Sequence, residues 1–141
     1  MTTFFDTSVL VAAFQGSHNH HEQSNTALAG VAQKEGACGA HTLAEFYSVT
    51  TRLPIASRFE PAHSLLCIEQ IAEHLHLVAL DTDEYLNEMR QAVANGTPGG
   101  KIYDALLLAC ARKAKADRIL TWNVKHFQSV APDLSDRIVT P

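Results

Sequence analysis

Three carboxylates in this sequence stand in surroundings that are too apolar for an isolated charge. Asp6 directly follows the apolar stretch "TTFF", Glu45 lies inside "TLAEFYSV", and Asp104 lies inside "KIYDALLLACARK". An ionised carboxylate without a partner is costly in an apolar environment, and it takes up a proton if nothing stabilises its charge. Each of these side chains therefore needs a basic side chain, backbone donors or a cation as its partner.

Each carboxylate taken alone also has an ordinary structural explanation. Asp6 stands where a helix follows a strand, and aspartate is a common helix N-cap. Glu45 is placed so that it can lie on the polar face of a helix. Asp104 falls near the start of its helix, where a negative charge complements the helix dipole. These explanations remain open for the single residues.

Taken together, the three carboxylates and Asn123 indicate a site for a hard divalent cation. Carboxylate and amide oxygens suit Mg²⁺ or Mn²⁺, whereas no thiolate or imidazole is required, so zinc is not implied. An acidic cluster with such an ion is a common means of phosphodiester hydrolysis. The bound cation also allows an acidic protein to accept a polyanionic substrate.

The elements that must position these residues alternate between short apolar strands and helices. Strands are predicted at 2–5, 37–40, 77–80, 118–122 and 138–140, and helices at 7–14, 20–35, 41–53, 61–75, 81–96 and 101–115. This alternation is typical of a parallel sheet covered by helices on both faces. Without an internal repeat or a linker, residues 1–141 are predicted to form a single α/β domain. Asp6 and Asn123 each follow a strand, at the edge where open parallel sheets bind ligands.

Composition narrows the class of protein further. The 141 residues carry a net charge of −4, which argues against a protein that coats nucleic acid. No apolar run approaches the roughly 18 residues of a membrane span. The N-terminus does not resemble a secretory signal, so the expected location is the cytoplasm. The three separated cysteines form neither a disulfide framework nor a metal motif, and they are expected to be buried free thiols.

Two short motifs suggest other chemistry but are incomplete. "NGTPGGKI" superficially matches a phosphate-binding loop, but it lacks the first glycine and the hydroxyl residue after Lys101, and it follows a helix. "HNHH" at 18–21 suggests zinc, but no second cluster supplies the remaining ligands. We interpret it as the solvated start of a helix.

Three stretches of the chain, in this order, resemble the successive signatures of a known family. "FFDTSVLVAAF", "TLAEFYSVTTRLP" and "GGKIYDALLLACARKAKADRILTWNVKHF" look like the motifs of PIN-domain ribonucleases, specifically of VapC-type toxins from bacterial toxin–antitoxin pairs. The resemblance runs from about residue 4 to residue 127, which is nearly the whole chain.

The resemblance implies a PIN-like fold, with a parallel sheet of about five strands between helices, and a Mg²⁺- or Mn²⁺-dependent endoribonuclease. Asp6, Glu45 and Asp104 match the family's acidic metal-site positions. Asn123 stands where many members carry a fourth acid, so it is expected to support the site without adding charge. Thr121, with Asn123, matches the family's polar pair after the late strand, and Thr7 and Ser8 would add hydroxyl contacts, with helix capping as their ordinary alternative.

The resemblance also implies partners. An RNA substrate, either tRNA or rRNA, would meet the basic residues Lys101, Arg112, Lys113 and Lys125. For these cations, a solvated helix face is the ordinary alternative. A cognate antitoxin protein and a homodimer are expected, and a membrane is not. The alternative function is a noncatalytic or housekeeping PIN-like module that binds RNA or protein, which is favoured if the amide at Asn123 disables the metal site.

Overall fold

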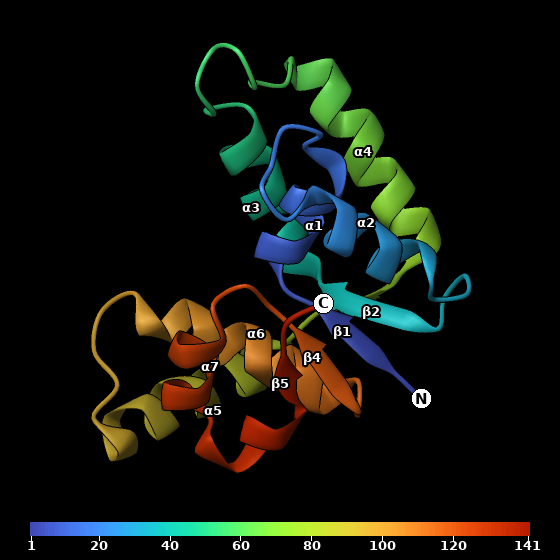
Figure 1. Cartoon of the computed structure of the whole chain (residues 1–141). Coiled ribbons are helices and arrows are strands. Elements are labelled where there is room, and N and C mark those ends of the chain that lie inside the picture. The colour runs from blue at the N-terminus through green and yellow to red at the C-terminus, as the bar shows by residue number, and fades with distance from the viewer.

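Five short parallel strands form the centre of the computed structural model, which describes all of residues 1–141 (Figure 1). The strands are β1 (Thr3–Phe5), β2 (Gly36–Gly39), β3 (His76–Val78), β4 (Arg118–Leu120) and β5 (Ile138–Val139). Their order in the sheet is β3-β2-β1-β4-β5, and every neighbouring pair is parallel. The predicted α/β class and its parallel sheet are therefore confirmed.

Helices cover both faces of this sheet (Figure 1). Four lie on one side, namely α1 (Thr7–Phe14), α2 (His21–Ala29), α3 (Ala40–Thr50) and α4 (Pro61–His74). The other side carries α5 (Thr82–Asn95), α6 (Lys101–Lys113), α7 (Val124–Val130) and the 3₁₀ helix η1 (Pro132–Arg137). No helix is long and apolar enough to cross a bilayer.

Two hydrophobic cores form because successive strand residues point to opposite faces of the sheet. Phe4 and Ile119 belong to the core beneath α6 and α7, whereas their neighbours Phe5 and Leu120 belong to the core beneath α1, α3 and α4. All four side chains are almost completely buried. This burial on both faces explains why the strands read as continuous apolar runs in the sequence.

Local sequence signals set the ends of α4 and α5, which match the predicted ranges 61–75 and 81–96 to within one residue. Asp81 caps α5, and its side chain accepts from the backbone N–H of Glu84, whose own side chain accepts from the N–H of Asp81. Gly96 ends the helix in the left-handed conformation, with φ of 64°. Pro61 occupies the first turn of α4.

One predicted helix was wrong in its extent, and two short helices were not predicted. The helix predicted for 20–35 ends at Ala29, and Gly36 begins β2 instead of closing the helix. A Cβ at Gly36 would lie 2.8 Å from Leu75 Cδ2 and 3.1 Å from Phe5 Cε2, so close packing of the strand requires a glycine there. The helices α7 and η1 were not predicted, because both are short and each buries a single side chain, Phe127 and Leu134 respectively.

The cysteines are free and buried, as predicted. Burial raises the pKa of the Cys38 thiol to about 12 and that of Cys110 to about 11. Because the thiolate is the reactive form, these cysteines are inert packing residues at neutral pH.

Candidate active site

The strand order creates a switch point between β1 and β4. From β1 the chain proceeds outward to β2 and β3, and it then crosses to the other side of β1 to form β4. The loops that leave β1 and β4 therefore diverge, and the crevice between them is the usual ligand position in open α/β sheets. Asp6 directly follows β1, and Thr121 directly follows β4.

Asp6 is a buried carboxylate held by two hydroxyl groups. Its side chain is 4% exposed, and its Oδ2 accepts hydrogen bonds from Ser8 Oγ at 2.7 Å and Thr121 Oγ1 at 2.8 Å. Although Asp6 occupies the N-cap position of α1, it makes no capping hydrogen bond. The backbone N–H groups of Ser8 and Thr7 lower the pKa of this carboxyl, but less strongly than the two hydroxyl groups do.

The two hydroxyls that hold Asp6 are themselves oriented by the backbone after β4. The N–H of Trp122 donates to Ser8 Oγ at 3.1 Å, and the N–H of Asn123 donates to Thr121 Oγ1 at 3.0 Å. With an N–H as donor to each hydroxyl oxygen, the hydroxyl hydrogens are directed to Asp6. Both hydroxyl groups donate to Oδ2, and no side chain donates to Oδ1.

The environment of Asp6 disfavours its charged form. Burial raises the pKa of the Asp6 carboxyl above its usual value, and the hydrogen bonds from Ser8 and Thr121 oppose that rise only in part. The charge of Asp6 is thus only partly compensated by the protein itself.

Glu45 lies half-buried on α3, close enough to Asp6 for the charge of Asp6 to raise its pKa. Its Oε1 accepts a hydrogen bond from Thr7 Oγ1 at 3.3 Å. Burial raises the pKa of Glu45, the negative charges of Asp6 and Asp104 raise it further, and His41 opposes the rise. The ordinary explanation required Glu45 to lie on a solvated polar face of its helix. The half-buried position of its side chain does not agree with that explanation.

Asp104 lies half-buried in the first turn of α6, as the helix-dipole explanation required. Its environment nevertheless disfavours the charge, since burial and then the charge of Asp6 raise the pKa of Asp104, against the opposing effect of His126. The helix that carries Asp104 is not apolar on all faces, because Tyr103 is 56% exposed. Asp104 takes part in neither of the two ion pairs of the molecule.

The three carboxylates carry charges that no basic side chain pairs with. They come from three parts of the chain, and the charge of Asp6 raises the pKa of both Glu45 and Asp104. No three acidic, histidine or cysteine side chains of the structure lie close enough together to hold a metal ion by themselves. An ion held by Asp6, Glu45 and Asp104 would therefore keep water molecules as further ligands, as Mg²⁺ usually does.

Asn123 lies exposed at the rim of this site, at the N-cap position of α7, and its side chain makes no capping hydrogen bond. Its backbone N–H contributes to the site through Thr121 Oγ1. Thr121, in contrast, is fully buried and in direct contact with Asp6.

The basic residues predicted from the sequence do not form one patch at the site. Arg112 pairs with Asp133 at 2.6 Å, and Lys113 pairs with Glu84 at 2.6 Å. Both lie at the C-terminal end of α6, which the helical rise of 1.5 Å per residue places about 12 Å from Asp104. Lys101 at the start of α6 and Lys125 on α7 are exposed and form no ion pair.

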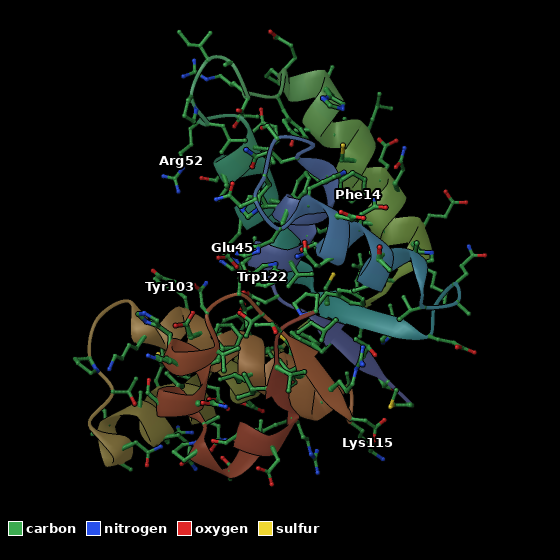
Figure 2. The ribbon with its side chains drawn as sticks, viewed as in Figure 1. Phe14, Glu45, Arg52, Tyr103, Lys115 and Trp122 are labelled. Atoms are coloured by element: carbon green, nitrogen blue, oxygen red, sulfur yellow. The ribbon has the colours of Figure 1, made fainter.

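The structure adds histidines and aromatic residues that sequence reasoning did not assign to the site. His41 precedes Glu45 by one helical turn, a spacing that could have identified it. His126 lowers the pKa of Asp104 by its charge. The backbone N–H of Trp122 donates a hydrogen bond to Ser8 Oγ, which in turn contacts Asp6. Figure 2 shows Glu45, Tyr103 and Trp122 gathered where the two helical layers meet.

"HNHH" is not a zinc site in the structure. The His20 ring stacks on Trp122, with ring centroids 3.7 Å apart. The Nδ1 of His21 lies 2.9 Å from the carbonyl oxygen of Ala12. A helix does start here as expected, because α2 begins at His21. The rings of His20 and His21 are nevertheless not simply solvated, since each has a specific partner.

Comparison with known proteins places the chain among nucleases. A family model described as PIN domain matches residues 3–131. Ribonuclease VapC40 of Mycobacterium tuberculosis is 35% identical over 124 residues, which cover 88% of each chain.

Solved structures share the fold. The M. tuberculosis toxin VapC20, described as cleaving the sarcin-ricin loop, has a TM-score of 0.72 at 14% identity and covers 90% of this chain and 94% of its own. A toxin–antitoxin complex from Klebsiella pneumoniae has a TM-score of 0.68 at 17% identity and covers 99% and 97% respectively. At these identities the structures show the fold alone.

Proposed function

This chain belongs to the PIN-domain family, and on that premise we propose that it is a divalent-metal-dependent endoribonuclease, the toxin of a VapC-type toxin–antitoxin pair. The observation that carries this proposal is that Asp6, a buried carboxylate at the switch point of the sheet, raises the pKa of two further carboxylates, Glu45 and Asp104. The ribonuclease relative that spans 88% of the chain supports the same conclusion.

We assign each residue a role from its surroundings. Asp6 and Asp104 would hold the ion, which we propose is Mg²⁺ or Mn²⁺ because all donors are oxygens. A bound ion of this kind neutralises the phosphodiester and lowers the pKa of the attacking water. Ser8 and Thr121 fix Asp6 in place.

Glu45 is suited to orient the attacking water or to accept its proton. Its raised pKa makes it a better base than an ordinary carboxylate, and Thr7 holds it by a hydrogen bond. Asn123 would contribute a neutral amide at the rim, so the charge for ion binding comes from the three carboxylates. Lys101 and Lys125, which form no ion pair, are the best placed of the predicted cations to contact RNA phosphates.

We further propose an antitoxin partner, a tRNA or rRNA substrate and a homodimer. The toxin–antitoxin complex from K. pneumoniae, which shares this fold, supports the antitoxin. Exposed apolar side chains support protein partners, because such patches commonly mark interfaces. They are Leu65 and Leu66 on α4 and Leu86, Met89 and Val93 on α5.

Cleavage of RNA is the direct test of this function. Purified protein is incubated with mixed tRNA and rRNA in Mg²⁺, in Mn²⁺ or in EDTA. We expect discrete fragments with either ion and none with EDTA. Absence of cleavage together with absence of ion binding in calorimetry would contradict the nuclease. That result would favour the noncatalytic RNA- or protein-binding module, for which the neutral amide of Asn123 is the specific argument.

Ion binding is expected to weaken as the pH falls, beginning above the range of ordinary carboxylates near 4. Binding requires the ionised forms of Asp6, Glu45 and Asp104, and all three pKa values are raised, so protons compete with the ion at a higher pH than usual. Calorimetric titration of Mn²⁺ at a series of pH values checks this. A dissociation constant that stays constant down to about pH 4 would contradict it.

A further inference from the structure

Arg52 is an exposed cation at the end of α3 that has no partner in the protein. It follows Thr51, and its backbone N–H donates to the carbonyl of Val49 at 3.3 Å, so the last turn of the helix extends to it. Its side chain takes part in neither of the two ion pairs. The layer formed by α1 to α4 contains two other lysine or arginine residues, Lys34 and Arg58, and both donate to backbone carbonyls. Arg52 is therefore the free cation of this layer.

Helical geometry places Arg52 on the same face of α3 as Glu45. Seven residues come within about 20° of two full turns, and they span about 10 Å along the axis. Figure 2 shows Arg52 and Glu45 on the same side of the molecule as Tyr103. The face that α3 buries is a different one, formed by Thr42, Phe46 and Thr50.

The face of α3 that carries Glu45 also carries two exposed polar side chains, His41 and Ser48. His41 lies one turn before Glu45, and its ring is nearly parallel to that of Tyr103 on α6, with centroids 6.3 Å apart. Ser48 lies between Glu45 and Arg52. We call the face formed by His41, Glu45, Ser48 and Arg52 the polar track. It leads from the meeting of the two helical layers, past the carboxylate, to the free guanidinium.

The carboxylate site needs cations around it to hold an RNA strand. Its three acids make the site negative, and RNA phosphates are negative as well. Lys101 and Lys125, the unpaired cations already assigned to RNA, lie on α6 and α7 in the opposite layer. Arg52 supplies a cation on the α3 side, so that positive charge flanks the site in both layers.

We propose that Arg52 binds a phosphate of the RNA a few nucleotides from the scissile one, and that the polar track carries the RNA backbone between them. This inference rests on the proposed nuclease function, since Glu45 must face the bond that is cleaved. A strand carries one charge per about 3.4 Å in a duplex, so a reach of about 10 Å spans only a few phosphates. The guanidinium can donate two parallel hydrogen bonds to one phosphate.

A crosslink locates position 52 on the RNA. Arg52→Cys introduces an exposed thiol, whereas the three native cysteines are buried and have raised pKa values, so a thiol-reactive photocrosslinker attaches at position 52 alone. The Asp104→Asn background, which should bind RNA without cutting it, is illuminated with mixed tRNA and rRNA. We expect crosslinks within a few nucleotides of the sites that the unmodified protein cleaves. Arg118→Cys is the matched control, because Arg118 begins β4 and so lies at the opposite edge of the sheet. Crosslinks at the same nucleotides from both positions would overturn the proposal.

Charge variants measure what the contact contributes. Arg52→Gln keeps much of the side-chain length and should raise KM about three- to fivefold at low salt, the strength of one exposed charge pair, with kcat unchanged. In the Asp104→Asn background, the slope of log Kd against log salt concentration should fall by about 0.7, which corresponds to one phosphate contact. Arg52→Lys keeps the charge and should keep the slope. Arg118→Gln should change neither KM nor the slope, and circular dichroism checks that each variant is folded.

The outcomes separate this inference from the nuclease proposal. Metal-dependent cleavage with an unchanged KM and salt slope in Arg52→Gln would overturn the phosphate contact and leave the nuclease intact. A lower melting temperature with unchanged KM would overturn it as well, because Arg52 would then only complement the dipole of α3. A variant that cleaves normally but escapes inhibition by the antitoxin would assign Arg52 to that protein partner instead. Weaker RNA binding by Arg52→Gln, without cleavage by the unmodified protein in any metal, would support the contact and contradict the nuclease.

Discussion

Asp104→Asn is expected to reduce metal-dependent RNA cleavage by about a hundredfold or more. Substituting a residue that only hydrogen-bonds to a metal ligand already lowers metal affinity or activity by about 10- to 100-fold. The substitution keeps the shape of the side chain and removes its charge. The fold should survive, because Asp104 forms no ion pair and its charge is disfavoured by burial and by Asp6. Cleavage rates in Mg²⁺ and Mn²⁺ and thermal unfolding measure the two effects.

Glu88→Gln is the matched control for Asp104→Asn. Glu88 is also half-buried with a pKa raised by burial, but it lies on α5 outside the site. Its substitution should leave cleavage unchanged. Undiminished cleavage by Asp104→Asn, with Glu88→Gln equally active, would show that the carboxylates assigned here are not the catalytic ones.

Asp6→Asn is expected to abolish cleavage and, at the same time, to stabilise the metal-free protein at neutral pH. An amide oxygen can still accept from Ser8 and Thr121, while the buried charge is removed. Because desolvating an ion costs several kcal/mol, the free energy of unfolding should rise by about 1 kcal/mol or more. Saturating Mn²⁺ should raise the melting temperature of the unmodified protein only, since Asp6→Asn has lost a ligand.

The pH dependence of stability shows whether Asp6→Asn stabilises the protein by removing a buried charge or by changing the packing. The pKa of Asp6 is higher in the folded than in the unfolded chain, so its contribution to stability is fully present below the unfolded value of 3.8 and is lost as the pH rises through the folded pKa. Urea denaturation without metal should therefore show the advantage of Asp6→Asn at neutral pH and little difference at acidic pH.

Asp133→Asn serves as a control, because the pKa of Asp133 is lowered in the folded protein whereas that of Asp6 is raised. The Arg112 guanidinium lowers the pKa of the Asp133 carboxyl, and the pair is exposed. Its substitution should cost at most about 1 kcal/mol at neutral pH and leave cleavage unchanged. A metal-free Asp6→Asn protein that is less stable than the unmodified one at neutral pH would mean that the hydroxyl contacts outweigh the desolvation of the charge.

The sequence by itself determined the class of fold and most of its elements, because the signals are local. Apolar runs alternating with helical patterns indicated a parallel sheet, and Asp81, Gly96 and Pro61 marked helix ends by their own backbone preferences. Where such signals were weak, prediction failed. The seven residues of α7 bury only Phe127, and the close approach of Leu75 that makes Gly36 a strand residue comes from a distant element.

The sequence also identified the carboxylates, because Asp6 and Asp104 stand in apolar runs where a charge is costly. Only the tertiary structure decided what surrounds them. The order of the strands makes β1 and β4 neighbours and so places Thr121 on Asp6. Folding also pairs Arg112 and Lys113 with acids far from the site.

The aromatic pairs depended on the tertiary structure entirely. The partners of each pair lie far apart in the sequence: His41 on α3 and Tyr103 on α6 have ring centroids 6.3 Å apart, and His20 before α2 stacks on Trp122 in the loop after β4. No local pattern links His41 to Tyr103 or His20 to Trp122, because their proximity follows from how two helical layers meet over one edge of the sheet. A residue's type and its neighbours in the chain specify which chemistry it can perform, and the packing of the layers specifies with which partners it performs it.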